Sequence, residues 1–228
     1  MIAPVEQKQT SAAEMYRAIV GIGALCALVI VGVFQGTAAR IADNQARFLA
    51  GAIAEVLPET VSTVEVSINA SGSLVPASEY GPLPGFLSFD ANGDLAGAVL
   101  TAEGMGYQDI VRILYSYSFE LDAIVGMKVL ETKETPGLGD KIETEPHFVA
   151  NFDALDASLN ANGDALQNVI VTVKQGEKTE PWQLDGITGA TITSEAIGNM
   201  LNESANRWVP VLERDAAAIN PEARPDGE

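Results

Sequence analysis

Hydrophobic positions divide the chain into one continuous apolar stretch and a longer region of short apolar runs separated by turn residues. Residues 18–39 contain no charged side chain, and a helix needs about 20 such residues to cross a bilayer. A cleaved signal peptide is the alternative, but its apolar stretch is normally only about 7–15 residues long. The pattern therefore favours a retained transmembrane helix at 18–39, with a short N-terminal segment at 1–17 before it.

A connector is expected between this span and the folded domain. Its apolar residues recur at helical spacing until Pro58, so the connector could continue the membrane helix into water. Residues 58–67 are rich in Val and Thr, which favours extended structure. The connector is thus predicted as helical and then extended over residues 40–67.

Two turn sequences indicate hairpins. FLSF and LAGAVL flank DANGD, in which Asn92-Gly93 is a strong hairpin signal. A calcium loop is the alternative, but Gly93 comes too early and Thr101, at the twelfth position, lacks the required bidentate carboxylate. We interpret DANGD as a turn, and the similar NANGD at 160–164 in the same way.

The remaining pattern predicts an α+β fold for residues 68–213, with helices packed on an antiparallel sheet. Three stretches rich in Val, Ile and Tyr are expected to be strands: DIVRILYSYSF, AIVGMKVLET and NVIVTVKQ. A final helix should begin within DGITGATITS (185–194), capped by Thr193 or Ser194, and end at Pro210. The tail, residues 214–228, is predicted to be flexible.

Charge is concentrated after the apolar stretch. The 228-residue chain has a net charge of −18, and residues 50–228 hold nine Lys and Arg against 28 Asp and Glu. Such a polyanionic domain would be repelled by nucleic acid and by anionic lipid headgroups, so both are excluded as partners of its surface.

Several kinds of chemical site are also excluded. The single cysteine, Cys26, lies in the apolar stretch, so no intramolecular disulfide and no cysteine-based zinc, iron–sulfur or c-type haem site can form. The only histidine, His147, has no partners at metal-ligand spacing, and we assign it a structural role. GMGY at 104–107 lacks the third glycine of a dinucleotide fingerprint. We therefore predict no metal site and no catalytic residues.

Two loops could bind a cofactor. ETPGLGD (134–140) follows a predicted strand, and its proline and glycines give a rigid backbone that a flat ring can approach closely, although a plain connecting turn has the same composition. DGITGATITS lies where the last helix should begin, so free N–H groups and the helix dipole there favour a phosphate.

Together, KETPGLGDKIE (133–143) and DGITGATITS resemble the FMN-binding domain of the G subunits of Rnf electron-transport complexes. The related C subunits of sodium-translocating NADH:quinone oxidoreductases are the next most similar family. The order of elements is also similar: an N-terminal membrane helix, a GY element at Gly106-Tyr107, the ETPGLG strand and loop, and the TGAT segment before a closing helix.

The resemblance implies a covalent cofactor. In these proteins a separate flavin transferase uses FAD to attach FMN, through its phosphate, to a threonine in D-x-x-(S/T)-G-A-T. Here the motif residues are Asp185, Thr188, Gly189, Ala190 and the acceptor Thr191. Thr188 stands where the family often has Ser, and spacing alone does not choose among Thr188, Thr191 and Thr193.

Other residues are expected to surround the cofactor. Thr188, Thr193 and Ser194 could donate hydrogen bonds to the phosphodiester. The isoalloxazine ring would lie against Tyr107 and the ETPGLG loop, which comprises Glu134, Thr135, Pro136, Gly137, Leu138 and Gly139.

The resemblance also implies a function. It predicts an electron-transfer protein of an Rnf-type ion-translocating ferredoxin:NAD oxidoreductase, not catalytic alone, that assembles with other membrane and peripheral subunits. The chain would be a single-pass protein of the bacterial inner membrane, with residues 1–17 cytoplasmic and the FMN domain extracytoplasmic. The alternatives are a C subunit of the quinone-reductase type, another membrane-anchored FMN carrier, and an anchored binding module without cofactor.

Overall fold

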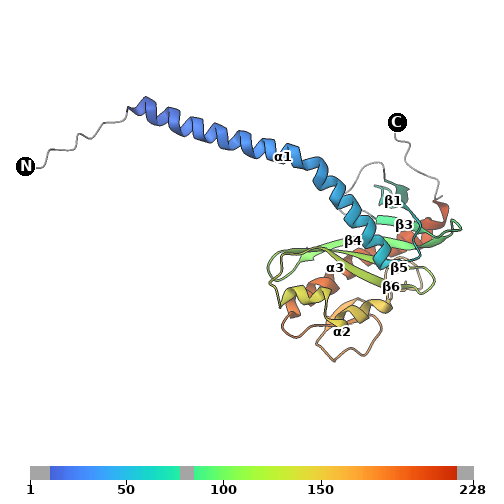
Figure 1. The fold of residues 1–228 in the computed structure, drawn as a ribbon. Helices are drawn as coiled ribbons and strands as arrows, with labels where there is room; N and C mark the ends of the chain where they lie inside the picture. Colours follow the sequence, from blue (N-terminus) through green and yellow to red (C-terminus); the bar gives the residue numbers. More distant parts are fainter. Residues whose placement is uncertain (1–10, 78–84, 220–228) are drawn as a thin grey trace, which may run out of the picture. The chain divides into compact units, whose positions relative to one another are not determined.

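The computed structural model describes residues 11–77 and 85–219 (Figure 1). These residues form two units that meet between Phe48 and Leu49. The first unit is helical, and the second contains the sheet and the remaining helices. The described part does not include residues 1–10 and 220–228, which belong to the predicted terminal segments.

The apolar stretch lies in one long helix, α1, which runs from Ala12 to Val56. It is long and apolar enough to cross a membrane, and the large apolar side chains of residues 19–34 are exposed, as expected for a surface that faces lipid. Residues 40–56 continue the same helix, as the spacing before Pro58 predicted. Only its end contributes buried residues, which are Ala52, Ile53 and Val56.

The second unit is built on a seven-stranded antiparallel sheet of strand order β2-β1-β3-β4-β5-β6-β7. Its strands are β1 Ser62–Ile68, β2 Leu74–Pro76, β3 Gly85–Phe89, β4 Leu95–Met105, β5 Ile110–Ser118, β6 Ala123–Glu131 and β7 Leu155–Asp156. The DANGD hairpin is confirmed: it joins β3 to β4, with Gly93 at φ +86°. NANGD also turns, and Gly163 there has a φ of +72°.

The two faces of the sheet are covered by different helices. On one face lies α3, Thr191–Asp215, which crosses the sheet and buries eleven of its residues (Figure 1). On the other face, the end of α1 packs against Phe86, Val99 and Leu114. Short helices complete the unit: the 3₁₀ helices Gly139–Glu143, Ala150–Asp153 and Ala216–Ala218, and α2 Pro146–Val149.

Two boundaries differ from the prediction. The folded unit begins at Leu49 and not at residue 68, because the end of α1 and all of β1 pack in it. α3 continues through Pro210 to Asp215. A helical proline costs about 3 kcal/mol, but Leu212 beyond it is buried in the core, and Asp215 accepts a hydrogen bond from the N–H of Leu74 at 2.9 Å.

One predicted strand does not belong to the seven-stranded sheet. Within NVIVTVKQ, β8 (Val171–Val173) pairs in parallel with β9 (Gln183–Asp185) as a separate two-stranded sheet. Asp185, the first residue of the TGAT-containing motif, therefore ends a strand, and only five residues connect it to α3.

The end of α1 is held to the sheet by close backbone contact. The carbonyl of Val56 accepts a hydrogen bond from Ser116 Oγ at 2.7 Å, and Lys128 pairs with Glu55 at 2.8 Å. A Cβ at Gly126 would lie 2.5 Å from the carbonyl oxygen of Val56, which leaves no room for any side chain.

We expect Gly126→Ala to lower the free energy of unfolding by about 1–3 kcal/mol, because overpacking forces the helix end away from the sheet. Thermal unfolding of the full chain in detergent measures this loss. The matched control is Gly51→Ala in α1, since nothing lies within 4 Å of an added Cβ there. Equal stability of the two variants would contradict the close contact.

Candidate functional site

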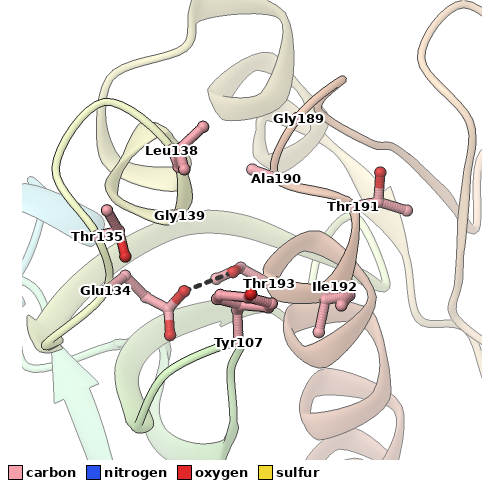
Figure 2. A pocket seen from close by; sticks show the side chains of 10 residues that line it. All are labelled: Tyr107, Glu134, Thr135, Leu138, Gly139, Gly189, Ala190, Thr191, Ile192 and Thr193. Atoms are coloured by element: carbon pink, nitrogen blue, oxygen red, sulfur yellow. Dashed lines mark hydrogen bonds between the residues drawn. The ribbon is translucent and has the colours of Figure 1, made fainter.

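Three loops that are distant in sequence meet around one cavity of about 360 Å³ (Figure 2). They are the turn between β4 and β5, the ETPGLG loop after β6 and the TGAT segment at the start of α3. The residues lining the cavity are Tyr107, Glu134, Thr135, Leu138, Gly139, Gly189, Ala190, Thr191, Ile192 and Thr193. The structure thus brings the two motifs together with Tyr107.

Apolar side chains form much of the cavity wall. Tyr107 is 66% exposed, Leu138 48% and Ile192 52%, although all three are large and apolar. In Figure 2 the Tyr107 ring lies beside Glu134 and Thr193, with Leu138 and Ala190 on the opposite side of the cavity. Exposed apolar residues gathered around a cavity are typical of a binding site.

Glu134 connects the three loops. Its side chain is only 6% exposed. One carboxylate oxygen accepts a hydrogen bond from the N–H of Gln108 at 2.9 Å, and the other accepts one from the hydroxyl of Thr193 at 2.7 Å (Figure 2). The motif glutamate therefore fixes the β4–β5 turn and the start of α3 to its own loop.

Pro136 and Gly137 shape the ETPGLG loop without lining the cavity. The N–H of Leu138 bonds to the carbonyl of Thr135 at 3.1 Å, and Gly137 has a φ of +79°, which favours glycine. The hydroxyl of Thr135 donates to Gln108 Oε1 at 2.8 Å. The loop is thus a rigid turn whose two ends, Glu134-Thr135 and Leu138-Gly139, line the cavity.

The start of α3 presents unused hydrogen-bond donors. Thr191 is the first helical residue, and the preceding Ala190 provides no side-chain cap. In the described part of the chain, the backbone N–H groups of Thr191, Ile192 and Thr193 have no hydrogen-bond partner. These donors and the positive end of the helix dipole favour an anionic group at Thr191.

The motif hydroxyls have different environments. Thr193 is 1% exposed and bonded to Glu134. Ser194 is fully buried, where its hydroxyl accepts from the N–H of Ile187 at 3.2 Å and donates to the carbonyl of Ala190 at 2.9 Å. Thr188 is exposed but does not line the cavity of about 360 Å³ in which the two motifs meet. Thr191 is both exposed and part of the cavity wall.

One expectation for these hydroxyls is therefore wrong. Neither Thr193 nor Ser194 caps α3, because both lie inside the helix, which begins before them. Their hydroxyls donate to Glu134 and to the carbonyl of Ala190, so a hydrogen bond from either one to a phosphodiester would require that hydroxyl to leave its present acceptor.

A second cavity, of about 620 Å³, opens on the other side of Thr191. It is lined by Thr188 and by residues of β8 and the turn that follows, including Lys174 and Gln175. The N–H of Thr188 bonds to Gln175 Oε1 at 3.1 Å. Thr191 therefore lines both cavities.

Asp185 lines neither cavity but supports the motif from outside. Its carboxylate accepts a hydrogen bond from the N–H of Gly176 at 2.6 Å. Its backbone is held by buried Asn151, whose Oδ1 accepts from Asp185 N–H at 2.9 Å and whose Nδ2 donates to Asp185 O at 3.1 Å. Partial burial lowers the pKa of nearby Lys178, which also donates to Asn151.

His147 contacts the same segment. Its Nε2 lies 3.1 Å from the carbonyl oxygen of Gly186, and its Nδ1 lies 3.2 Å from Glu145. Among the residues that the structure describes, no group of three or more His, Cys, Asp or Glu side chains could hold a metal ion. Sequence reasoning missed both Asn151 and this contact of His147, since nothing in the local sequence marks either residue.

Comparison with known proteins places these features in a family. Residues 106–206 match the family model described as the FMN-binding domain. A G subunit of the ion-translocating oxidoreductase complex from Shewanella piezotolerans is 30% identical over 77% of this chain and 79% of its own length. The chain belongs to the family of G subunits of ion-translocating oxidoreductase complexes. The corresponding G subunit from Methanosarcina acetivorans is 28% identical, over 82% of this chain and 89% of that relative.

Solved structures share the fold of this member of the G-subunit family. NqrC from Shewanella oneidensis has a TM-score of 0.53 and 16% identity, over 75% of this chain and 94% of that one. The C subunit of the Na⁺-translocating NADH-quinone reductase from Parabacteroides distasonis has a TM-score of 0.54 and 24% identity, over 67% and 78%. At these identities the likeness concerns the fold alone. The predicted fold class, a membrane helix followed by an FMN-binding domain with an antiparallel sheet and packed helices, is confirmed.

Proposed function

We propose that this protein carries FMN, bonded through its phosphate to Thr191, and relays electrons within an Rnf-type complex of the bacterial inner membrane. The observation that carries the proposal is the position of Thr191. Its exposed hydroxyl lies in the wall of the cavity where the ETPGLG and TGAT loops meet, at the start of a helix with free N–H groups. The FMN-binding family model covers the same residues.

The cavity walls suit the two ends of FMN. The unpaired N–H groups of α3 would hold the phosphodiester, which keeps one negative charge. The apolar surfaces of Tyr107, Leu138 and Ile192 would contact the flat isoalloxazine ring, and the ring polar groups would meet the loop backbone. When bound, the flavin supplies the redox chemistry, while the protein positions it and excludes water.

Attachment requires a separate enzyme. A threonine hydroxyl is a poor nucleophile unless a base removes its proton. His147 cannot serve, because it contacts Gly186 and Glu145 and lines neither cavity beside Thr191. A flavin transferase would supply the base and metal: Thr191 Oγ attacks the FMN-side phosphorus of FAD, the phosphoanhydride bond breaks and AMP leaves. Gly189 and Ala190 leave space for the transferase.

The long apolar helix α1 supports a membrane location. α1 would anchor the protein in the membrane with its acidic domain on the extracytoplasmic side, where free FMN is scarce. A covalent bond there replaces the need for tight binding. Other membrane and peripheral subunits of the complex would donate and accept the electrons.

The test is expression of the full chain in a bacterium with an active flavin transferase. We expect the protein to gain the mass of FMN less water and to remain fluorescent in a denaturing gel. Omission of the transferase should remove both signals. If the protein stays unmodified although a known transferase substrate in the same cells is flavinylated, the covalent flavin proposal is wrong.

A further inference from the structure

A buried carboxylate without a cation lies in the cavity wall. Glu134 is 6% exposed, and among the described residues it forms no ion pair within 4.0 Å. Figure 2 shows it beside the Tyr107 ring with its carboxylate toward Thr193, and it lines the same cavity as Thr191. Burying a charge without a partner is costly, so its presence requires an explanation.

The surrounding backbone is shaped to admit this carboxylate. A Cβ at Gly106 would lie 2.5 Å from Glu134 Oε1, and one at Gly139 would overlap the other carboxylate oxygen. Glycine at both neighbouring positions thus leaves room for the carboxylate in this orientation. Three hydrogen bonds keep the side chain in one orientation: those from Gln108 N–H and the Thr193 hydroxyl, and a longer one of 3.5 Å from Asp109 N–H.

The nearest basic residue in sequence does not neutralise Glu134. Lys133 is 67% exposed and pairs with Asp109 at 3.0 Å. The pKa of Asp109 is lowered first by the N–H of Ile110 and then by Lys133, while the pKa of Lys133 is raised by Asp109. In this exposed pair, the charges of Lys133 and Asp109 offset each other. Among the described residues, the groups that form hydrogen bonds to the Glu134 carboxylate are therefore neutral donors.

We propose that Glu134 lowers the midpoint potential of the flavin, in addition to holding the three loops together. The inference rests on the proposed function. Each electron added to the flavin increases the negative charge in the cavity, and a fixed carboxylate in its wall opposes that increase. Glu134 itself gains and loses no electron. It acts through its charge and so helps to determine which partners can donate electrons to this protein.

Glu134→Gln removes the negative charge of the side chain but can keep the hydrogen bonds that join the three loops. The amide has nearly the same shape; its oxygen can accept from Gln108 N–H while its NH₂ donates to the Thr193 hydroxyl. We expect the purified full chain to be flavinylated as before. Its midpoint potential should rise so that the reduced-to-oxidised ratio at a fixed ambient potential increases about tenfold, which is about 30 mV for a two-electron couple.

Thr193→Val is the matched control. It removes one hydrogen bond from Glu134 but keeps the charge, so its potential should stay constant or fall. A general distortion of the site would move both variants in the same direction, which would overturn the proposal. An adduct on Glu134→Gln with an unchanged or lower potential would also overturn it. Loss of the adduct from this variant alone would count against it too, because the carboxylate would then serve attachment and not the potential. An unmodified wild-type chain would instead refute the proposed function, and this inference would fall with it.

Discussion

Thr191→Ala is expected to carry no covalent flavin at all. Within DGITGATITS, Thr191 carries the only hydroxyl that belongs to an exposed residue and to the wall of the cavity of about 360 Å³, and the substitution removes it. The neighbouring hydroxyls on α3 are not available in the same way, because Thr193 is buried against Glu134 and Ser194 is buried and bonded to the carbonyl of Ala190. Intact mass and in-gel fluorescence measure the loss, which should be complete. Stability should change by less than about 0.5 kcal/mol, since the side chain is exposed and makes no hydrogen bond in the described part of the chain.

Matched variants at neighbouring hydroxyls distinguish the acceptor from its surroundings. Thr188→Ala should keep the adduct, because Thr188 faces only the second cavity. Thr191→Ser keeps a hydroxyl at the same position and should retain at least part of the modification. A fluorescent band that persists in Thr191→Ala and disappears in Thr188→Ala would move the attachment site to Thr188.

The sequence predicted those parts of the fold that depend on local pattern. The uncharged stretch at 18–39 predicted the membrane helix, and the apolar spacing before Pro58 predicted its continuation. Asn92-Gly93 predicted the β3–β4 hairpin because only a few residue types adopt positive φ there. The two loops were expected near one another only because a family resemblance linked them; β6 and α3 bring them together through long-range packing that local pattern does not encode.

Long-range contacts also explain the wrong predictions. Pro210 breaks helices on intrinsic propensity, yet the buried residues beyond it and the bond from Leu74 to Asp215 keep α3 intact. Thr193 and Ser194 have the composition of N-caps, but tertiary partners use their hydroxyls inside the helix. The residue type determines which hydrogen bonds a side chain can form, and the fold determines which of these hydrogen bonds are present.

Asn151 provides the second large effect, because it holds the segment that leads to Thr191, the proposed attachment site. It is 3% exposed, and its amide bonds both backbone groups of Asp185 and the carbonyl of Phe148 at 2.9 Å. Asn151→Leu would remove the amide partner of both Asp185 backbone groups, which are partly buried, and each unsatisfied buried group costs about 1–3 kcal/mol. We expect the free energy of unfolding to fall by about 3–5 kcal/mol. That is a large part of the roughly 5–15 kcal/mol of a typical domain.

The same substitution should also impair flavin attachment, although Asn151 lies in neither cavity that Thr191 lines. Asp185 is joined to Thr191 by five residues, so loosening its backbone should change the position of Thr191 and of the α3 N–H groups that we propose hold the phosphate. Thermal unfolding in detergent and the flavinylated fraction below the unfolding temperature measure the two effects separately. Asn199→Leu is the control, since Asn199 is exposed on α3 and its replacement should change stability by less than about 0.5 kcal/mol. If Asn151→Leu unfolds at a lower temperature but is fully flavinylated while folded, Asn151 stabilises the domain without positioning the acceptor.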